Sequence, residues 1–256
     1  MFRYVLLLSI MFMGCLYAED EELARLFAQH HLEGTLLIES LDGKERYVHN
    51  ESRANTPLLP ASTFKIPHTL IALDQGVVNE HSLILWDKIE RAIPAWNHDQ
   101  TLESAFKSSC VWCYQTFARR IGLETYNAYL KKLHYGNEQT GEDVERFWLD
   151  GRLRISAKEQ VAFLKRLYLS DLPFSQNDMA LLKKIMIDEQ RQNAIIRAKT
   201  GWAVPQGEEH HGWYVGYVET QKGVYFFATN LITPSSDVLP LRKSITLEAL
   251  ALKGIL

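Results

Sequence analysis

The residues of this 256-residue chain that could do chemistry begin with a serine and a lysine three positions apart, in Ser62-Thr63-Phe64-Lys65. A stretch with helical periodicity begins at the serine, and helical residues three apart lie on one face with Cβ atoms about 5–6 Å apart. The Lys65 amine can therefore reach the Ser62 hydroxyl. Because free serine is a weak nucleophile that needs a neighbour to take its proton, the pair predicts a nucleophile and its base. An N-capping serine beside a solvated lysine has the same spacing, so the motif needs corroboration.

A second motif, Lys199-Thr200-Gly201, ends a predicted strand late in the chain. Glycine in a strand lets the backbone of a substrate approach closely, and Lys199 and Thr200 offer a cation and a hydroxyl to a carboxylate. An ordinary strand end has the same residue types. Ser-x-x-Lys followed by Lys-Thr-Gly is, however, the order found in penicillin-recognising serine enzymes.

The middle motif, Ser109-Cys110-Val111, resembles the Ser-x-Val of class D β-lactamases, the oxacillinase family. The Ser-Asp-Asn motif of class A enzymes does not occur in the sequence. The resemblance spans most of the chain, because four further landmarks stand in family order. They are Tyr135-Gly136-Asn137, Phe147-Trp148-Leu149-Asp150-Gly151, Gly212-Trp213-Tyr214-Val215-Gly216 and Leu239-Pro240-Leu241-Arg242-Lys243.

The resemblance implies a role for each matching residue. Ser62 would attack the lactam carbonyl and form an acyl-enzyme, and the backbone N–H groups of Ser62 and Trp202 would form the oxyanion hole. Ser109 would relay a proton to the departing lactam nitrogen with help from Lys199. The implied substrate-binding residues are Thr200, Gly201, Trp202 and Arg242.

Deacylation needs a base that activates water, and the resemblance implies an N-carboxylated Lys65 as the base of both half-reactions. A lysine with its ordinary pKa of about 10.4 is protonated at neutral pH, but burial disfavours the charged form. We expect a neutral Lys65 that adds carbon dioxide, supplied as bicarbonate, with no other cofactor and no metal. The residues expected to stabilise the carbamate are Val111, Trp148 and Leu149.

Strand patterns at both ends of the chain enclose a long helical stretch. Five strands are predicted, at 34–40, 46–48, 193–199, 212–219 and 223–231. Helices are predicted over 21–30, over a stretch from 62 to about 184 with breaks at Pro94, Gly136 and Pro173, and from Pro240 to about 252. This order predicts an α+β fold, with an antiparallel sheet flanked by N- and C-terminal helices and an inserted all-helical region.

Length and composition predict one globular unit rather than separate domains, since the chain is 46% hydrophobic and 23% charged. We expect a β-lactamase domain over residues 19–256. Its sheet region would span about 19–58 and 190–256, and its helical region about 59–189. A groove where the two regions meet is the natural place for a site.

The first 18 residues have the pattern of a secretory signal peptide. Arg3 is followed by a run of ten apolar residues at 4–13, and Ala18 precedes the acidic pair Glu19-Asp20. We expect cleavage after Ala18 and a periplasmic location; a lipoprotein acylated on Cys15 is the alternative. No later segment reaches the roughly 18 apolar residues that a membrane span needs.

Cys110 and Cys113 form a CxxC pair, a spacing that also occurs in redox and zinc sites. A zinc site needs two more ligands, and the nine histidines show no matching pair at metal-ligand spacing. A local disulfide is the other alternative, although cysteines three apart on a helix meet disulfide geometry poorly.

The formal net charge of −3 gives no basic stripe, so no nucleic-acid partner is expected. The partners that the resemblance implies are small-molecule β-lactam substrates, bound by a monomer or homodimer. Three alternatives keep part of this interpretation: a penicillin-sensing domain that stays acylated, a DD-peptidase, and a periplasmic binding module without chemistry. Rapid release of a chromogenic cephalosporin would distinguish a β-lactamase from the sensor and the DD-peptidase, and a Ser62→Ala variant that keeps ligand affinity and function would indicate the binding module.

Overall fold

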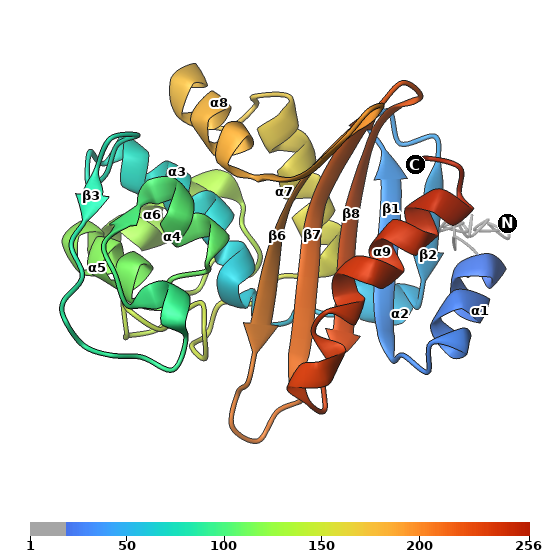
Figure 1. The fold of residues 1–256 in the computed structure, drawn as a ribbon, viewed down its shortest axis with the longest axis horizontal. Helices are drawn as coiled ribbons and strands as arrows, with labels where there is room; N and C mark the ends of the chain where they lie inside the picture. Colours follow the sequence, from blue (N-terminus) through green and yellow to red (C-terminus); the bar gives the residue numbers. More distant parts are fainter. Residues whose placement is uncertain (1–18) are drawn as a thin grey trace, which may run out of the picture.

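A six-stranded antiparallel sheet runs through the computed structural model, which describes residues 19–256 (Figure 1). The predicted signal peptide and Cys15 lie outside the described residues. The strand order is β2-β1-β8-β7-β6-β5. The strands are β1 (Gly34–Ser40), β2 (Arg46–His49), β5 (Ile187–Arg191), β6 (Ala194–Ala203), β7 (His211–Thr220) and β8 (Gly223–Ile232).

The sheet combines the two ends of the chain. The predicted hairpin of β1 and β2 is confirmed, and Gly43 in its turn has a φ of 71°, a conformation that glycine adopts at low cost. Strand β1 pairs along its whole length with β8, from Gly34 opposite Leu231 to Ser40 opposite Tyr225. The N-terminal hairpin therefore extends a sheet whose other strands lie near the C-terminus.

Both faces of the sheet are buried, as the side chains of β7 show. Trp213, Val215 and Tyr217 pack into the core shared with the helical region, whereas Tyr214 and Val218 pack into a second core on the opposite face. This alternation follows from the two-residue repeat of a strand. The second core is covered by α1 (Glu21–Gln29) and α9 (Leu241–Leu252), which lie against each other on that face in Figure 1.

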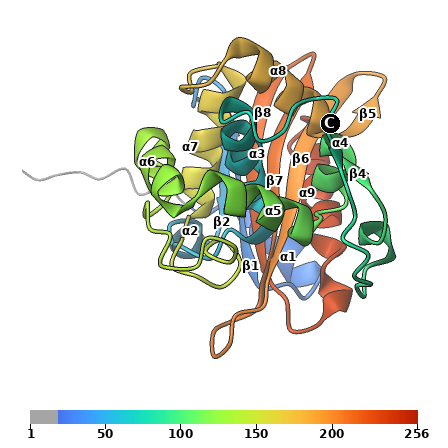
Figure 2. The same ribbon diagram turned by 90° about the vertical axis from the view of Figure 1, so that its left-hand side faces the viewer.

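The segment between β2 and β5 is mostly helical and covers the other face. Figure 2, seen from this side, shows α3, α5 and α6 in front of the sheet, while α7 packs on β1, β7 and β8. The helices are α2 (Glu51–Ala54), α3 (Lys65–Asp74), α4 (Leu102–Lys107), α5 (Val111–Ile121), α6 (Leu123–Leu133), α7 (Ala157–Tyr168) and α8 (Gln176–Ile185). Short 3₁₀ turns lie at η1 (Ala61–Phe64), η2 (Pro94–Trp96) and η3 (Ser236–Val238).

The predicted fold class is confirmed, with three local differences. A two-residue pairing of β3 (Leu83–Ile84) with β4 (Gln100–Thr101) interrupts the helical region. Strand β6 extends to Ala203, beyond the predicted end. Edge strand β5 was not predicted, because it lacks the alternation of apolar and polar residues that indicates a strand; after Ile187 it consists of Asp188, Glu189, Gln190 and Arg191.

Candidate active site

Ser62 lies in a tight turn that leads into α3. Ala61 is fully buried with a φ of 47°, a conformation that non-glycine residues rarely adopt and that is concentrated at functional sites. Thr63 holds this turn: its Oγ1 donates to the Pro60 carbonyl oxygen at 2.7 Å and accepts from Gln160 Nε2 at 2.8 Å. The strained backbone at Ala61, directly before Ser62, is therefore secured by buried hydrogen bonds from two sides.

The Lys65 side chain is fully buried, and its Nζ lies 3.2 Å from Ser62 Oγ. The predicted pairing of these two groups is thus present across the junction of η1 and α3. Burial, reinforced by the positive charge of Lys199, holds the pKa of Lys65 well below its ordinary value. The amine next to the serine hydroxyl is accordingly favoured in its neutral form, in which it can accept a proton.

Strand β6 brings the second and third motifs together. Lys199 Nζ donates to Ser109 Oγ and also lies 3.1 Å from the carbonyl oxygen of Thr200. Burial, together with the charge of Arg242, lowers the pKa of Lys199 to about 7. At neutral pH Lys199 therefore divides between its protonated and neutral forms, and a proton can pass between it and Ser109.

Gly201 lies where β6 passes close to the serine turn. A Cβ atom on this residue would be 2.9 Å from the Pro60 carbonyl oxygen and 3.1 Å from Thr63 Cγ2, so a side chain there would push the strand away from Ser62. Arg242, in the first turn of α9, donates to the Gly201 carbonyl oxygen at 2.5 Å. Burial lowers the pKa of Arg242 to about 10, so it stays charged at neutral pH. Trp202 follows and is 44% exposed.

Trp148 is fully buried, and its Nε1 has no hydrogen-bond partner within residues 19–256. The indole is 6.0 Å from the Phe64 ring, between the centroids, and 5.1 Å from that of His68, which places it beside the helix start that carries Lys65. Val111 begins α5 two residues after Ser109 and is half-buried. Leu149, also half-buried, packs against the same core as Trp148. The structure thus offers an unpaired buried donor near the lysine, within apolar walls.

Two buried residues near Lys65, Tyr114 and His68, were not identified as site residues from the sequence. Tyr114 lies three residues after Val111 on α5, and the Lys65 Nζ is 4.8 Å from its ring centroid. His68 lies three residues after Lys65 on α3, and its Nε2 is 2.5 Å from Tyr126 Oη. Burial, together with the nearby Lys65, holds the pKa of His68 well below its ordinary value. The three-residue spacing on one helix face could have identified both.

Cys110 and Cys113 form a disulfide, with Cα atoms 5.5 Å apart. The expectation that their spacing suits a disulfide poorly was wrong, because Cys110 is not inside the helix. It is the N-cap residue of α5 with a ψ of 107°, and this non-helical backbone allows its sulfur to bond to that of Cys113. No cluster of three or more metal-ligand side chains exists among residues 19–256.

These features define a serine acyl-transfer protein of the penicillin-recognising class: a serine–lysine pair, a Lys-Thr-Gly strand, and a sheet with an inserted helical region. The family model described as the transpeptidase domain of penicillin-binding proteins matches residues 36–251. This match covers far more than half of the chain.

Individual relatives narrow the class. The chain is 44% identical to β-lactamase OXA-48 of Klebsiella pneumoniae, over 90% of this chain and 87% of the relative, and 43% identical to OXA-20 of Pseudomonas aeruginosa, over 85% and 81%. The chain therefore belongs to the class D β-lactamases, the oxacillinase family, and is a hydrolase. The resemblance found in its sequence is confirmed.

Solved structures agree with this assignment. The class D β-lactamase YbXI from Nostoc superposes with a TM-score of 0.89 at 42% identity, covering 91% of this chain and 99% of that one. FUS-1 (OXA-85), a class D β-lactamase from Fusobacterium nucleatum, gives 0.90 at 36% identity, covering 93% and 100%. Among residues 19–256, no helix is both long and apolar enough to cross a bilayer.

Proposed function

We propose that this protein opens the β-lactam ring of penicillins and related antibiotics through an acyl-enzyme on Ser62, releases the product by hydrolysis, and so confers antibiotic resistance. The observation that carries the proposal is the buried Lys65 amine, 3.2 Å from Ser62 Oγ and favoured in its neutral form. A protonated lysine could only donate to the serine, whereas a neutral one can add carbon dioxide and so carry the base that takes the serine proton.

In acylation, Ser62 Oγ attacks the lactam carbonyl carbon and loses its proton to the carboxylate carried by Lys65. The C–N bond of the ring then breaks, and the nitrogen receives a proton from Ser109, which is replenished by Lys199 through the contact between their side chains. The backbone N–H groups of Ser62 and Trp202 are the proposed donors to the oxyanion.

Substrate binding is assigned to the residues that directly follow Lys199 on β6, together with Arg242. Arg242 is positively charged at neutral pH and touches the strand at Gly201, and Thr200 adds a hydroxyl, so the two suit a substrate carboxylate. Gly201 has no side chain and keeps β6 close to the serine turn. Trp202, partly exposed, offers an aromatic surface beside them.

Carbon dioxide suits the environment of Lys65. A neutral amine adds it with formation of an N–C bond and loss of one proton, and the carbamate would supply a carboxylate as the general base of both half-reactions. Trp148 Nε1 is a buried donor without a partner among the described residues, as an added anionic oxygen would require. Val111 and Leu149 would limit the access of water to it.

We also propose the processing and location of the protein. Residues 1–18 would be removed as a signal peptide, leaving a domain over 19–256 that acts in the periplasm as a monomer or homodimer. Its sheet region would correspond to about 19–58 and 190–256, and its helical region to about 59–189. The partners are β-lactam molecules, without nucleic acid.

The test is hydrolysis of a chromogenic cephalosporin and a penicillin panel, with and without added bicarbonate, together with the intact mass of the penicillin-treated protein. We expect turnover within seconds, stimulation by bicarbonate after carbon dioxide is removed, and a transient adduct on Ser62 that Ser62→Ala abolishes. A stable adduct without turnover would indicate a penicillin sensor or DD-peptidase. An adduct on any other side chain, or none at all, would overturn the proposal.

A further inference from the structure

The disulfide lies directly beside Ser109. Cys110 follows the serine and is the N-cap residue of α5, and its Sγ accepts a hydrogen bond from the backbone N–H of Cys113 at 3.3 Å. Both cysteines are fully buried. The cross-link therefore joins the residue next to Ser109 to the first turn of an 11-residue helix that is packed in the core.

Ser109 needs such support because of its backbone conformation. Its φ is 56°, in the left-handed region where a residue with a Cβ is strained. A strained residue keeps its conformation only when the structure around it imposes that conformation. The backbone N–H groups of Ser109 and Cys110 donate to the carbonyl oxygens of Phe106 at 3.2 Å and Ala105 at 2.9 Å. On the C-terminal side of Ser109, the disulfide limits the backbone rotations of Cys110.

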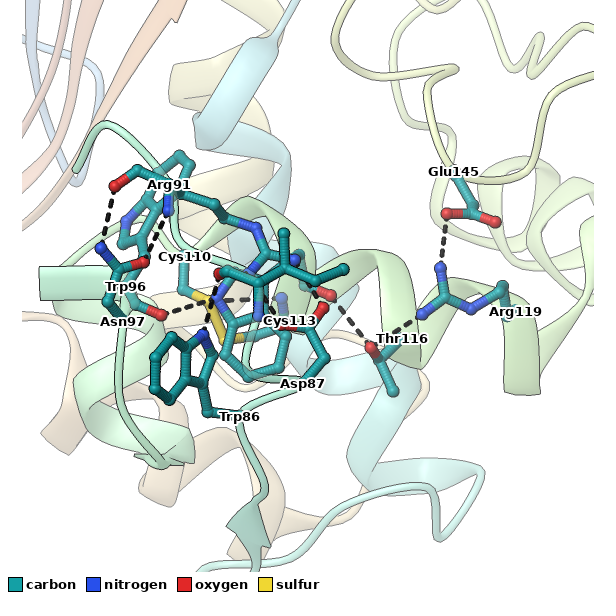
Figure 3. Close-up of polar contacts among 12 residues, drawn as sticks. Trp86, Asp87, Arg91, Trp96, Asn97, Cys110, Cys113, Thr116, Arg119 and Glu145 are labelled. Carbon is teal, nitrogen blue, oxygen red and sulfur yellow. Dashed lines mark hydrogen bonds and ion pairs between the residues drawn. A yellow bond between two sulfur atoms is a disulfide. The ribbon is translucent and has the colours of Figure 1, made fainter. Parts of the chain in front are cut away.

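The N-terminal side of Ser109 is held by a tryptophan pair. Trp96 Nε1 donates to the Ser108 carbonyl oxygen at 2.9 Å, and Trp112 Nε1 donates to the Trp96 carbonyl oxygen at 3.0 Å. The loop carrying Trp96 is itself braced by Asn97, whose side chain exchanges hydrogen bonds with the backbone of Arg91 (Figure 3). The chain is thus fixed before Ser109 by indole hydrogen bonds and after it by a covalent bond.

We propose that the Cys110–Cys113 disulfide is a positioning device that holds Ser109 Oγ against Lys199 for proton delivery during acylation. This inference rests on the proposed function and deepens it. The cysteines are positioning residues, since they act through Ser109 and not on the substrate. Lys65 and Trp148 lie on other elements, and α5, which carries Val111, keeps its own core packing through Phe117 and Ile121. The disulfide should therefore affect acylation far more than deacylation.

The test variant is Cys110→Ser/Cys113→Ala, which removes the cross-link but keeps a hydroxyl that can cap α5. Arg119→Gln is the matched control: it removes the ion pair of Arg119 with Glu145, at 2.6 Å, near the exposed end of the same helix (Figure 3). The acylation rate is measured in single turnovers by intact mass, and the fraction of active sites by the burst amplitude. Rates expressed per active site exclude a simple loss of folded protein.

We expect the disulfide variant to acylate about 10- to 100-fold more slowly, since misplacement of a reacting group by about 1 Å can cost about 100-fold. The deacylation rate, bicarbonate dependence and active fraction should stay within about threefold of wild type, and Arg119→Gln should match wild type. In a Ser109→Ala background, removal of the disulfide should have little further effect on acylation. Should Cys113→Ala prevent folding, Cys113→Val refills the volume and provides the same comparison.

An unchanged acylation rate, an equal fall in both half-reactions, or a full additional loss in the Ser109→Ala background would each overturn the positioning role. Failure of the wild-type protein to acylate Ser62 would instead refute the proposed function.

Discussion

Two lysines with nearly inaccessible amines show how differently this protein treats buried positive charge. Lys253, at the end of α9, has a side chain only 8% exposed, and its Nζ lies 2.7 Å from Asp20 Oδ2 and 2.6 Å from Glu22 Oε2. Burial lowers its pKa, but the hydrogen bonds that Lys253 donates to these carboxylates outweigh that effect and raise it. Lys65 is fully buried and forms no ion pair with any described residue; its pKa is lowered.

Burial alone therefore does not make a lysine neutral in this protein. The fold can supply carboxylates to a buried lysine, as it does where the start of α1 meets the end of α9. At the site it supplies another cation instead, Lys199, which disfavours the charged form of Lys65 further. One lysine is therefore structural and ionised, and the other is prepared for chemistry by the absence of a counter-charge among residues 19–256.

The largest contrast is expected from alanine at the two positions. Lys65→Ala should lower kcat for a chromogenic cephalosporin by about 10²- to 10⁴-fold, the range that a general base contributes. Lys253→Ala should leave kcat within about twofold, because its amine contacts no residue of the site. Full turnover by Lys65→Ala would refute the assignment of the base, and a large loss in Lys253→Ala would remove the distinction between the two lysines.

The pH dependence should follow the lowered pKa of Lys65. Above that pKa the amine is neutral and can hold carbon dioxide; as the pH falls through it, the amine is protonated and activity is lost, about tenfold per pH unit at the limit. Added bicarbonate should shift the acid limb of the kcat profile to lower pH, because it favours the carboxylated form. A profile that does not move when dissolved carbon dioxide is removed and restored would contradict this prediction.

Trp148→Phe should have an intermediate effect. Phenylalanine keeps an aromatic ring in contact with Phe64 and Phe147 but removes the indole N–H, and a hydrogen bond to a charged group contributes about 1.5–3 kcal/mol. We expect kcat to fall about 10- to 100-fold without bicarbonate and to recover substantially with it. Bicarbonate titrations of the two proteins measure this, and equal half-saturation would show that the indole does not hold the carbamate.

Much of the fold could be predicted because its signals are local. The hairpin has an Asp42-Gly43 turn between alternating strands, and the last helix follows Pro240 directly. The edge strand Ile187–Arg191 could not be predicted, since one of its sides is unpaired and its side chains are polar. Such a strand is specified by hydrogen bonds to β6 rather than by its own pattern.

The site was predictable to the extent that motifs carry it, and less where contacts do. The Ser62–Lys65 pairing follows from helical spacing, and the resemblance places Lys199 and Ser109 together, which the structure does. The disulfide could not be predicted, because it depends on the non-helical backbone of Cys110, one residue before the helix begins. Spacing in sequence does not reveal such a boundary to within one residue.

The smallest effect is expected at the structural lysine, in stability rather than activity. Lys253→Met should lower the free energy of unfolding at neutral pH by about 1–3 kcal/mol, because Asp20, the N-cap of α1, loses its charge partner while only 15% exposed. The folded-state pKa of Lys253 is raised above 10.5, so its contribution is fully present below the unfolded value and is lost as the pH rises through the folded one. Urea unfolding at neutral and strongly alkaline pH should therefore show a difference between wild type and variant that shrinks at high pH. A difference independent of pH would mean that Lys253 stabilises by packing against Tyr47 rather than by its charge.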